Sequence, residues 1–230
     1  MSCFHMTRRA VSVAALTVAL TPGIAFAQKS YGPGASDTEI KIGQTMPYSG
    51  PASAYGTQGR VEDAYFAMIN AKGGVNGRKI KLISLDDGYS PPKTVEQTRK
   101  LVEQENVLAI IGALGTPTNS ATQRYLNQNK VPQLFVSSGA AKWDDPKNFP
   151  WTTGMYPPYQ MEGQIFARYL LKHKPDAKLG VFSQNDDAGK DYVRGLKEGL
   201  GDKAAKMIVS EQSFMATDPT IESQVTGRSR

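Results

Sequence analysis

The amino-acid sequence predicts an α/β fold in which doubly wound parallel sheets are built from short strands joined by longer helices. Two observations carry this prediction. Between residues 40 and 214, short β-branched or apolar segments alternate with amphipathic segments of helical period. The segment 107–111 is apolar throughout, which is typical of a parallel strand buried on both faces. In a parallel sheet, strands and helices that alternate in this way are joined by right-handed crossovers.

The first part of the chain, up to residue 137, shows the alternation most clearly. In the helix predicted first, Val61, Tyr65 and Met68 lie on one face at helical spacing. The next helix begins with Pro91, because a proline is tolerated where no backbone N–H is needed. A glycine-rich turn at 73–77 separates the first helix from the second strand. The predicted strands are 40–45, 79–85, 107–111 and 132–137, and the predicted helices are 56–71, 91–104 and 118–128.

The alternation is interrupted after residue 137 and then starts again. A connecting loop at 142–150 and a short extended segment at 151–154 are predicted between the two parts. Because the pattern restarts there, we expect a second domain to begin near Trp151. Its predicted helices are 159–172 and 189–200, and its predicted strands are 178–183 and 206–214.

The N-terminus has the order of a cleavable signal peptide. Two arginines at 8–9 precede an uncharged apolar run at 10–20, and small residues follow at Ala25 and Ala27. A membrane anchor would need about 20 uninterrupted apolar residues, and Pro22 interrupts this run early. We therefore expect export with cleavage after Ala27.

Composition argues against two other classes of protein. The 27 basic residues exceed the 21 acidic residues only slightly, and the two kinds are interspersed, which does not favour nucleic-acid binding. The single cysteine, Cys3, lies inside the predicted signal peptide. The exported part is therefore expected to have neither a disulfide nor a lipid anchor.

A candidate anion site lies where the strand predicted at 107–111 ends. In open α/β sheets ligands bind at the carboxyl ends of the strands. Residues 112–118 lead from this strand into a helix start, where free N–H groups and the helix dipole favour an anion, and Thr116 and Thr118 add hydroxyls. A carboxylate fits there as well as a phosphate would, but no P-loop lysine follows, so phosphate transfer is not expected. The alternative is that one threonine only caps the helix.

Other strand ends supply further candidates, each with an alternative. Ser137, Ser138 and Gly139 offer hydroxyls and exposed backbone, or form a polar loop only. Tyr55 either covers an apolar ligand group or packs on its own helix. The acidic pairs 86–87 and 186–187 could bind a metal or transfer protons, but we expect them to cap the helices that follow.

The exported part contains no catalytic constellation. His173, the only histidine outside the predicted signal peptide, stands at a helix end, where a cation is favoured, and is interpreted as structural. We found no cysteine nucleophile, Gly-x-Ser-x-Gly, paired histidines at metal spacing or Gly-x-Gly-x-x-Gly after a strand. The sequence therefore predicts binding without catalysis, with no metal or other cofactor.

Several motifs together resemble the leucine/isoleucine/valine-binding proteins of ABC importers. They are Pro-Tyr-Ser-Gly-Pro at 47–51, Ile-Asn-Ala-Lys-Gly-Gly-Val-Asn-Gly at 69–77, Asp-Asp-Gly-Tyr-Ser-Pro at 86–91, Ile-Gly at 111–112 and Asn-Asp-Asp at 185–187. The resemblance implies the type I periplasmic-binding-protein fold: two doubly wound lobes joined by three crossing strands, with the ligand in the cleft between them.

The resemblance also implies which residues contact the ligand. They are Tyr55, Leu114, Gly115, Thr116, Ser137, Ser138, Gly139, Asp187 and Ala188. Thr116 matches the hydroxyl residue that holds the ligand carboxylate. Gly139 and Ala188 depart from a threonine and an aromatic residue in relatives. An aromatic or other carboxylate in a wider pocket is therefore an alternative to leucine.

The chain is shorter than the proteins it resembles, and we expect a C-terminal truncation. The expected organisation is a signal peptide at 1–27, a linker at 28–38, a first lobe at 39–150, a partial second lobe at 151–225 and an off-pattern tail at 226–230. The expected function is a periplasmic receptor that captures an amino acid or related small carboxylate for a membrane permease. The alternatives are a sensory module of the same fold and a non-functional truncated product.

Overall fold

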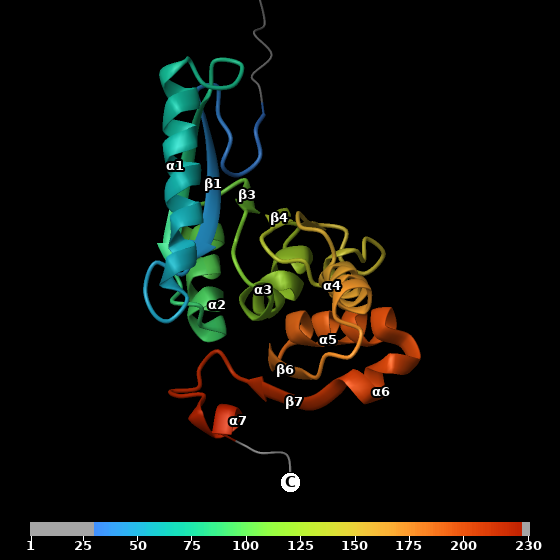
Figure 1. The fold of residues 1–230 in the computed structure, drawn as a ribbon. Helices are drawn as coiled ribbons and strands as arrows, with labels where there is room; N and C mark the ends of the chain where they lie inside the picture. Colours follow the sequence, from blue (N-terminus) through green and yellow to red (C-terminus); the bar gives the residue numbers. More distant parts are fainter. Residues whose placement is uncertain (1–29, 227–230) are drawn as a thin grey trace, which may run out of the picture. The chain divides into compact units, whose positions relative to one another are not determined.

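The structure, a computed structural model, describes residues 30–226. The predicted signal peptide, with its cleavage residues Ala25 and Ala27, and residues 227–230 of the predicted tail lie outside the described residues. Every helix and strand that the structure describes belongs to one compact unit, which begins at Tyr31. Figure 1 shows their order along the chain.

The elements alternate between strand and helix as predicted. The strands are β1 (Glu39–Met46), β2 (Lys79–Asp86), β3 (Ala109–Ile111), β4 (Gln133–Val136), β5 (Thr152–Gly154), β6 (Leu179–Gln184) and β7 (Ile208–Phe214). The α-helices are α1 (Gly56–Ala71), α2 (Pro91–Arg99), α3 (Thr116–Gln128), α4 (Tyr159–His173), α5 (Asp187–Leu200), α6 (Ala204–Met207) and α7 (Glu222–Thr226). A π-helical turn, Lys100–Gln104, continues α2 to the predicted end of that helix.

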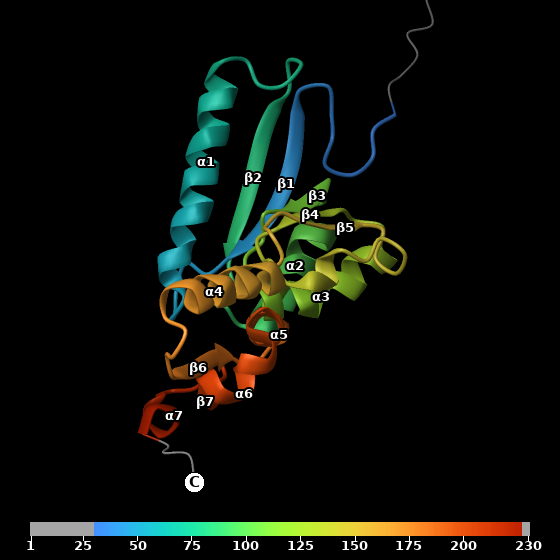
Figure 2. The ribbon, with the colours of Figure 1, turned by 45° about the vertical axis from the view of Figure 1, so that its right-hand side comes forward.

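Five strands form the first sheet, in the order β2-β1-β3-β4-β5, and every neighbouring pair is parallel. In Figure 2, α1 lies on one side of β1 and β2, and α2 and α3 lie on the other. The residues of β1 from Ile42 onward are buried, as expected for a central strand covered on both faces. The predicted α/β class with parallel, doubly wound sheets is confirmed.

The core of this first part lies between the sheet and the helices α2 and α3. Leu101 and Leu126 from the helical side meet Ile110 of β3, and all three side chains are almost fully buried. Burial of one such side chain contributes about 1.5–3 kcal/mol. This packing fixes the carboxyl end of β3, and with it the start of α3, where the candidate site lies.

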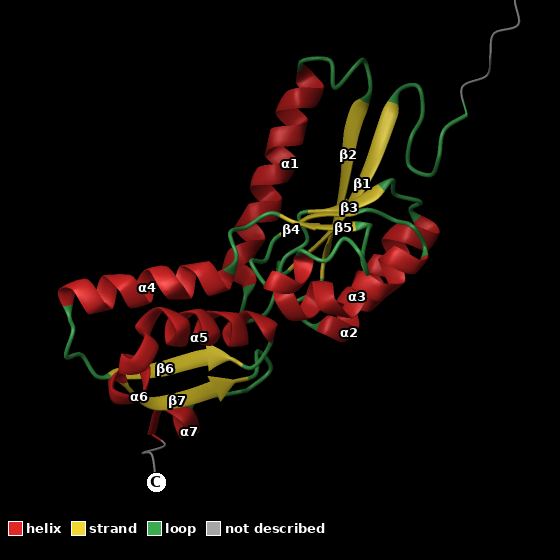
Figure 3. Cartoon of the chain, turned by 90° about the vertical axis from the view of Figure 1, so that its right-hand side faces the viewer, coloured by secondary structure: helices red, strands yellow, loops and turns green. Residues whose placement is uncertain are grey.

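The second sheet consists of β6 and β7, which are parallel. Figure 3 shows α4 and α5 on one side of these strands and α7 on the other. The two helices approach closely because Gly195 of α5 faces the backbone of α4, and a β-carbon at Gly195 would collide with the carbonyl oxygen of Gln160. The small residue is therefore required for the contact between α4 and α5.

Four elements begin two residues away from their predicted starts. β3 begins at Ala109, because the N–H of Val107 bonds to Leu101 O of the preceding helical turn. α3 begins at Thr116 rather than at 118, and α5 at Asp187 rather than at 189. β7 begins at Ile208, because Met207 is buried within the short helix α6.

The segment between the two predicted lobes contains structure that was not predicted. A 3-10 turn, Ala141–Trp143, begins one residue before the predicted loop at 142–150 and overlaps its first two residues. The predicted extended segment is β5, which pairs with β4, so the first sheet extends to Gly154. A division into lobes at residue 150 stays a prediction.

Candidate functional site

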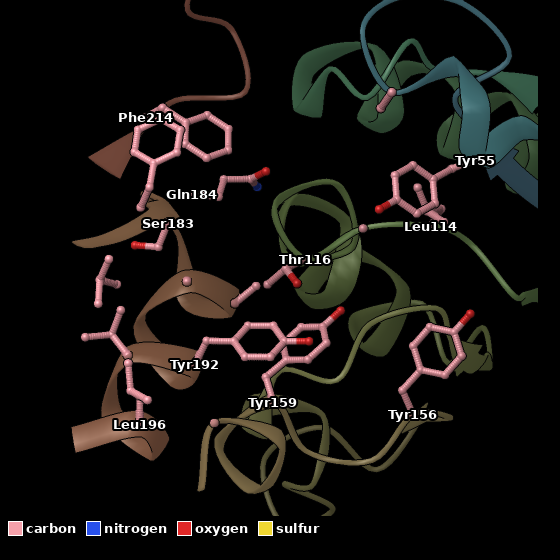
Figure 4. A pocket seen from close by; sticks show the side chains of 18 of the residues that line it. Tyr55, Leu114, Thr116, Tyr156, Tyr159, Ser183, Gln184, Tyr192, Leu196 and Phe214 are labelled. Carbon is pink, nitrogen blue, oxygen red and sulfur yellow. The ribbon is translucent and has the colours of Figure 1, made fainter. Parts of the chain in front are cut away.

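A cavity of about 560 Å³ lies at the carboxyl ends of the strands of the first sheet. Its walls come from the segments that follow β1, β2, β3, β4 and β5, from α4 and α5, and from the second sheet. Figure 4 shows Tyr55, Leu114 and Tyr156 on one side, and Gln184, Phe214 and Leu196 on the other, with Thr116 between them. The lining residues fall into three kinds. The polar ones are Thr116, Ser137, Ser183 and Gln184; the aromatic ones are Tyr55, Tyr89, Tyr156, Tyr159, Phe166, Phe182, Tyr192 and Phe214; and the small or aliphatic ones are Ala52, Leu114, Gly115, Gly163, Val181, Ala188, Gly189, Val193 and Leu196.

The turn at Gly115 brings the start of α3 into the cavity. Gly115 has φ 100°, a conformation that favours glycine, and a β-carbon there would lie 2.5 Å from Tyr89 Cε2. Gly115 is also the N-cap of α3 and provides no capping side chain. The first turn of α3 thus presents backbone N–H groups and the positive end of the helix dipole beside Thr116.

The hydroxyl of Thr116 is oriented by its neighbour Ser138. Ser138 Oγ accepts hydrogen bonds from Trp143 Nε1 at 2.8 Å and from Ala140 N at 3.2 Å, and it lies 2.6 Å from Thr116 Oγ1. A hydroxyl has two acceptor positions and one proton. Since Ser138 already accepts twice, its proton is donated to Thr116 Oγ1. The proton of Thr116 is therefore free to be donated to an anion in the cavity.

Ser137 lies next to Thr116. The N–H of Gly115 bonds to Ser137 O at 3.2 Å, and Leu114 forms an isolated parallel bridge with Ser137. Ser137 Oγ is 2.9 Å from Gln58 Oε1 and 3.0 Å from Tyr156 Oη. The cavity is thus lined by two residues with hydroxyls, Thr116 after β3 and Ser137 after β4, and the two hydroxyls have different partners.

Aromatic rings form much of the remaining wall. Tyr159 and Tyr192 are stacked, with ring centroids 4.6 Å apart, and Phe182 and Phe214 are stacked at 4.9 Å. Tyr192 Oη donates to Glu162 Oε2 at 2.6 Å, so its polar end is already bonded. Burial, and then the bond to Glu162, raises the pKa of Tyr192. These rings present apolar surface to a ligand.

Six of the nine predicted ligand residues line the cavity. They are Tyr55, Leu114, Gly115, Thr116, Ser137 and Ala188. Tyr55 is 63% exposed, and this exposure argues against the alternative that it packs on its own helix. Contact of these residues with a ligand stays a prediction.

The other three predicted residues do not line it. Ser138 is buried behind Thr116. Gly139 packs against the segment 157–159, and a β-carbon there would collide with Pro157 O, which explains why a larger residue is absent. The Asp187 side chain forms an ion pair with Lys142 at 3.0 Å.

The structure shows which of the residues predicted to cap helices do so. Thr118 Oγ1 donates to Leu114 O and to Gly115 O, so neither Thr116 nor Thr118 caps α3, and that alternative is wrong. Asp186 caps α5 by accepting from Gly189 N at 3.0 Å, as expected.

The first acidic pair does not cap α2, contrary to the expectation. Asp86 accepts from Tyr48 N, Ser49 N and Ser49 Oγ, and Asp87 accepts from Tyr89 N and Thr94 Oγ1. Burial by itself raises the pKa of Asp86, but hydrogen bonds from Ser49 and Lys93 outweigh it and lower that pKa well below its ordinary value. For the fully buried Asp87, loss of solvation raises the pKa. Both carboxyls position the loops of the site.

Several wall residues escaped the sequence reasoning. Gln184 is the last residue of β6 and Tyr89 lies in the loop after β2, and a position at a strand end was a usable signal. Tyr159 and Tyr192 lie on helices, where nothing in the sequence separates a cavity residue from a core residue.

Across residues 30–226, no group of three or more His, Cys, Asp or Glu side chains could hold a metal ion. In the same part of the chain, every helix is too short or too polar to cross a membrane.

Comparison with known proteins gives consistent matches. The family model described as periplasmic binding protein matches residues 39–226. An amino acid binding protein of Pseudomonas aeruginosa is 36% identical over 184 residues, covering 75% of this chain and 46% of the relative. A Leu/Ile/Val-binding protein of Rhizobium johnstonii is 27% identical over 202 residues, covering 85% and 52%.

A solved structure agrees in fold. The fatty acid ABC transporter substrate-binding protein from Thermomonospora curvata superposes with a TM-score of 0.72 at 26% identity, covering 86% of this chain and 50% of that chain. The chain spans about half the length of the curated relatives it matches.

Proposed function

The chain belongs to the periplasmic binding protein family, and on that basis we propose that it captures an amino acid or related small carboxylate and delivers it to the membrane permease of an ABC importer. The carboxylate is bound at Thr116 and the first turn of α3. The apolar part of the ligand lies among the aromatic side chains of the cavity. The proposed place of action is the periplasm.

One observation carries the proposal: Thr116, whose hydroxyl contacts Ser138 Oγ with that oxygen already accepting two N–H groups, stands at a helix start inside a cavity that is otherwise mainly apolar. Buried sites of this kind recognise a charged group with few polar contacts and the rest of the ligand by apolar surface. The names of the relatives support the same ligand class. An amino acid such as leucine and a fatty acid share a carboxylate attached to an apolar group.

Calorimetric titration of the 230-residue chain tests the proposal. The panel contains L-leucine, L-phenylalanine, benzoate and octanoate, with leucinol as the matched compound without a carboxylate. We expect at least one carboxylate to bind and leucinol not to bind. The absence of binding across the panel would contradict the proposal.

A matched pair of variants tests the role of Thr116. Thr116→Val keeps the shape but removes the donor, and a hydrogen bond to a charged group contributes about 1.5–3 kcal/mol. The affinity for the bound carboxylate should fall about tenfold or more. Thr116→Ser keeps the donor and should retain most of the affinity.

A further inference from the structure

Within residues 30–226, the chain passes once from the first sheet to the elements around the second sheet. The passage is the segment 155–158, which runs from the end of β5 to the start of α4. How firmly α5 is held to the first sheet therefore depends on non-covalent contacts. A hydrogen bond and an ion pair of this kind start from the 3-10 turn Ala141–Trp143, in the loop after β4.

This turn is anchored to the first sheet by its tryptophan. Trp143 is buried against Val136 of β4, and its Nε1 donates to Ser138 Oγ at 2.8 Å. Ala140 N, at the start of the turn, donates to the same oxygen at 3.2 Å. Ser138 Oγ also contacts the hydroxyl of Thr116 in the cavity. The turn therefore cannot shift without disturbing the hydrogen bonds around Ser138.

Two carboxylates of α5 hold the other side of the turn. Asp191 Oδ2 accepts from Ala141 N at 2.7 Å, and Asp187 Oδ2 forms an ion pair with Lys142 Nζ at 3.0 Å. The two carboxylates are four residues apart, so they lie on the same face of α5. The N–H of Ala141 is the first of the 3-10 turn and has no acceptor within it, so Asp191 supplies one from another element.

Asp191 is itself held in place, because both of its oxygens are bonded. Its side chain is only 10% exposed, and its Oδ1 accepts from Arg194 Nη2 at 2.6 Å. Arg194 Nη2 also donates to Gln160 Oε1 of α4 at 3.1 Å. The acceptor of Ala141 N is thus fixed to the pair of helices α4 and α5, which pack closely at Gly195.

The same part of α5 forms a wall of the candidate cavity. Ala188 and Tyr192, each the residue after one of the two carboxylates, line the cavity, whereas Asp187 and Asp191 do not. A contact that holds the carboxylates to the turn therefore also holds this wall to the loops at the ends of β3 and β4.

We propose that Asp191 and Lys142 are positioning residues that set how long a ligand stays in the cavity. Together with Asp187 and the backbone N–H of Ala141 they form a latch between α5 and the loop after β4, and a ligand leaves when this latch opens. The inference rests on the proposed function and names residues that control release. Neither Asp191 nor Lys142 lines the cavity, so loss of the latch should change the rate of dissociation rather than the choice of ligand.

Stopped-flow fluorescence of the full chain tests the latch. The probe is whichever of L-leucine, L-phenylalanine, benzoate and octanoate binds the wild type most tightly, and its rate of dissociation is measured after rapid dilution of the complex. Lys142→Met and Asp187→Asn each break the ion pair, and the double variant completes a cycle. Asp191→Ala removes the acceptor of Ala141 N, whereas Asp191→Asn keeps an oxygen there.

The matched control is a second ion pair of α5 that does not reach the first sheet. Lys197 Nζ lies 2.7 Å from Glu211 Oε2 of β7, and neither residue lines the cavity. Both members are about as exposed as Asp187, so Lys197→Met removes a similar contact. It should leave the rate of dissociation at the wild-type value.

In Lys142→Met we expect dissociation to be about two- to fivefold faster, as for a partly exposed ion pair. In Asp191→Ala it should be about tenfold faster or more, and Asp191→Asn should lie between this variant and the wild type. The double variant of Lys142 and Asp187 should release no faster than the single variants, because all three lack the same contact. A general loss of packing would instead lower the fraction of chains that bind and leave the rate of dissociation unchanged.

Wild-type rates of dissociation in Lys142→Met and Asp191→Ala overturn the latch and leave the proposed function standing. If Asp191→Ala does not fold, the cycle of Lys142 and Asp187 decides alone. Failure of every ligand to bind the wild type overturns the proposed function and this inference with it.

Discussion

The hydroxyl of Tyr89 accepts a hydrogen bond from Gln184 Nε2 at 3.3 Å, and this bond joins the loop after β2 to the end of β6 across the cavity. Gln184 Nε2 also donates to Asp186 Oδ2 at 2.7 Å, which holds the amide in place. Burial raises the pKa of Tyr89 to about 12, so the phenol stays protonated throughout the physiological range. The bond is thus one of the contacts that keep the two walls of the cavity together.

Tyr89→Phe should weaken binding without unfolding the protein. The substitution keeps the ring that packs on Gly115 and removes only the hydroxyl, and a neutral hydrogen bond contributes about 0.5–1.5 kcal/mol. We expect the dissociation constant for a bound carboxylate to rise about two- to tenfold. Calorimetric titration measures the effect, with Tyr65→Phe, an exposed tyrosine of α1 outside the cavity, as the control. Equal affinities of Tyr89→Phe and wild type would refute the role of this bond.

The two neighbouring carboxyls of the β2 loop should respond to acid with opposite signs. The pKa of Asp86 in the folded state lies below its ordinary value of 3.8, so its contribution is present above this pH and lost as the pH falls further. Asp86→Asn should lower the free energy of unfolding at pH 7, because it removes the charged acceptor of these hydrogen bonds. The expected loss is only about 1–2 kcal/mol, because the carboxylate is partly exposed to solvent. The free energy of unfolding of the wild type should fall between about pH 5 and 2, and this fall should be smaller in Asp86→Asn.

Asp87 should show the opposite dependence of stability on pH. Its pKa is raised by burial, so the charged form is a cost to the folded state that disappears as the pH falls through the raised pKa. In Asp87→Asn the new amide oxygen could still accept from Tyr89 N, and Thr94 Oγ1 could keep its bond to Ser90 O. Asp87→Asn should therefore be far less destabilising at pH 7 than Asp86→Asn. Urea unfolding of both variants from pH 3 to pH 8 measures the difference, and equal losses at pH 7 would contradict this account.

Ser138→Ala should destabilise the protein although the change is small. The substitution leaves Trp143 Nε1 buried without its acceptor, which costs about 1–3 kcal/mol. It also removes the donor to Thr116 Oγ1. Thermal or urea unfolding measures the loss, and Ser223→Ala at an exposed serine is the control. A variant as stable as the wild type would show that water replaces the lost group.

Gly195→Ala should disrupt the contact between α4 and α5. The added methyl group would meet the backbone of Gln160, which cannot move aside as a side chain can, and overpacking of this kind costs about 1–3 kcal/mol or more. Gly180→Ala is the matched control, because a β-carbon there meets nothing within 4 Å. The prediction fails if the two alanine variants unfold at the same urea concentration.

Much of the fold could be predicted because it depends on local periodicity. The apolar segment at 107–111, the proline at residue 91 and the glycines at 73–77 each identify an element or its end. Boundaries were less accurate where tertiary contacts decide them. Met207 joins a helix because its side chain is buried, although its sequence neighbours favour a strand.

The candidate site was predictable only where chain position indicates it. Ser137 directly follows β4, and Thr116 stands at the end of the loop after β3. The carboxyl ends of parallel strands lie at one edge of a sheet, which brings such residues together. Tyr192 and Gln58 lie on helices, and they reach the site only through packing that a single sequence does not show. The direction of the hydrogen bond between Ser138 and Thr116 is harder still to predict, since it depends on the two N–H groups that donate to Ser138 Oγ.

The contact at Gly195 limits how this binding site can change in evolution. Because α5 touches the backbone of α4, neither helix can shift to enlarge the cavity without loss of their contact. The stacked rings of Tyr159 on α4 and Tyr192 on α5 line the cavity, and they can be exchanged for smaller or larger side chains at far lower cost. Descendants of this chain would therefore acquire new ligands by substitution of rings on an unchanged pair of helices.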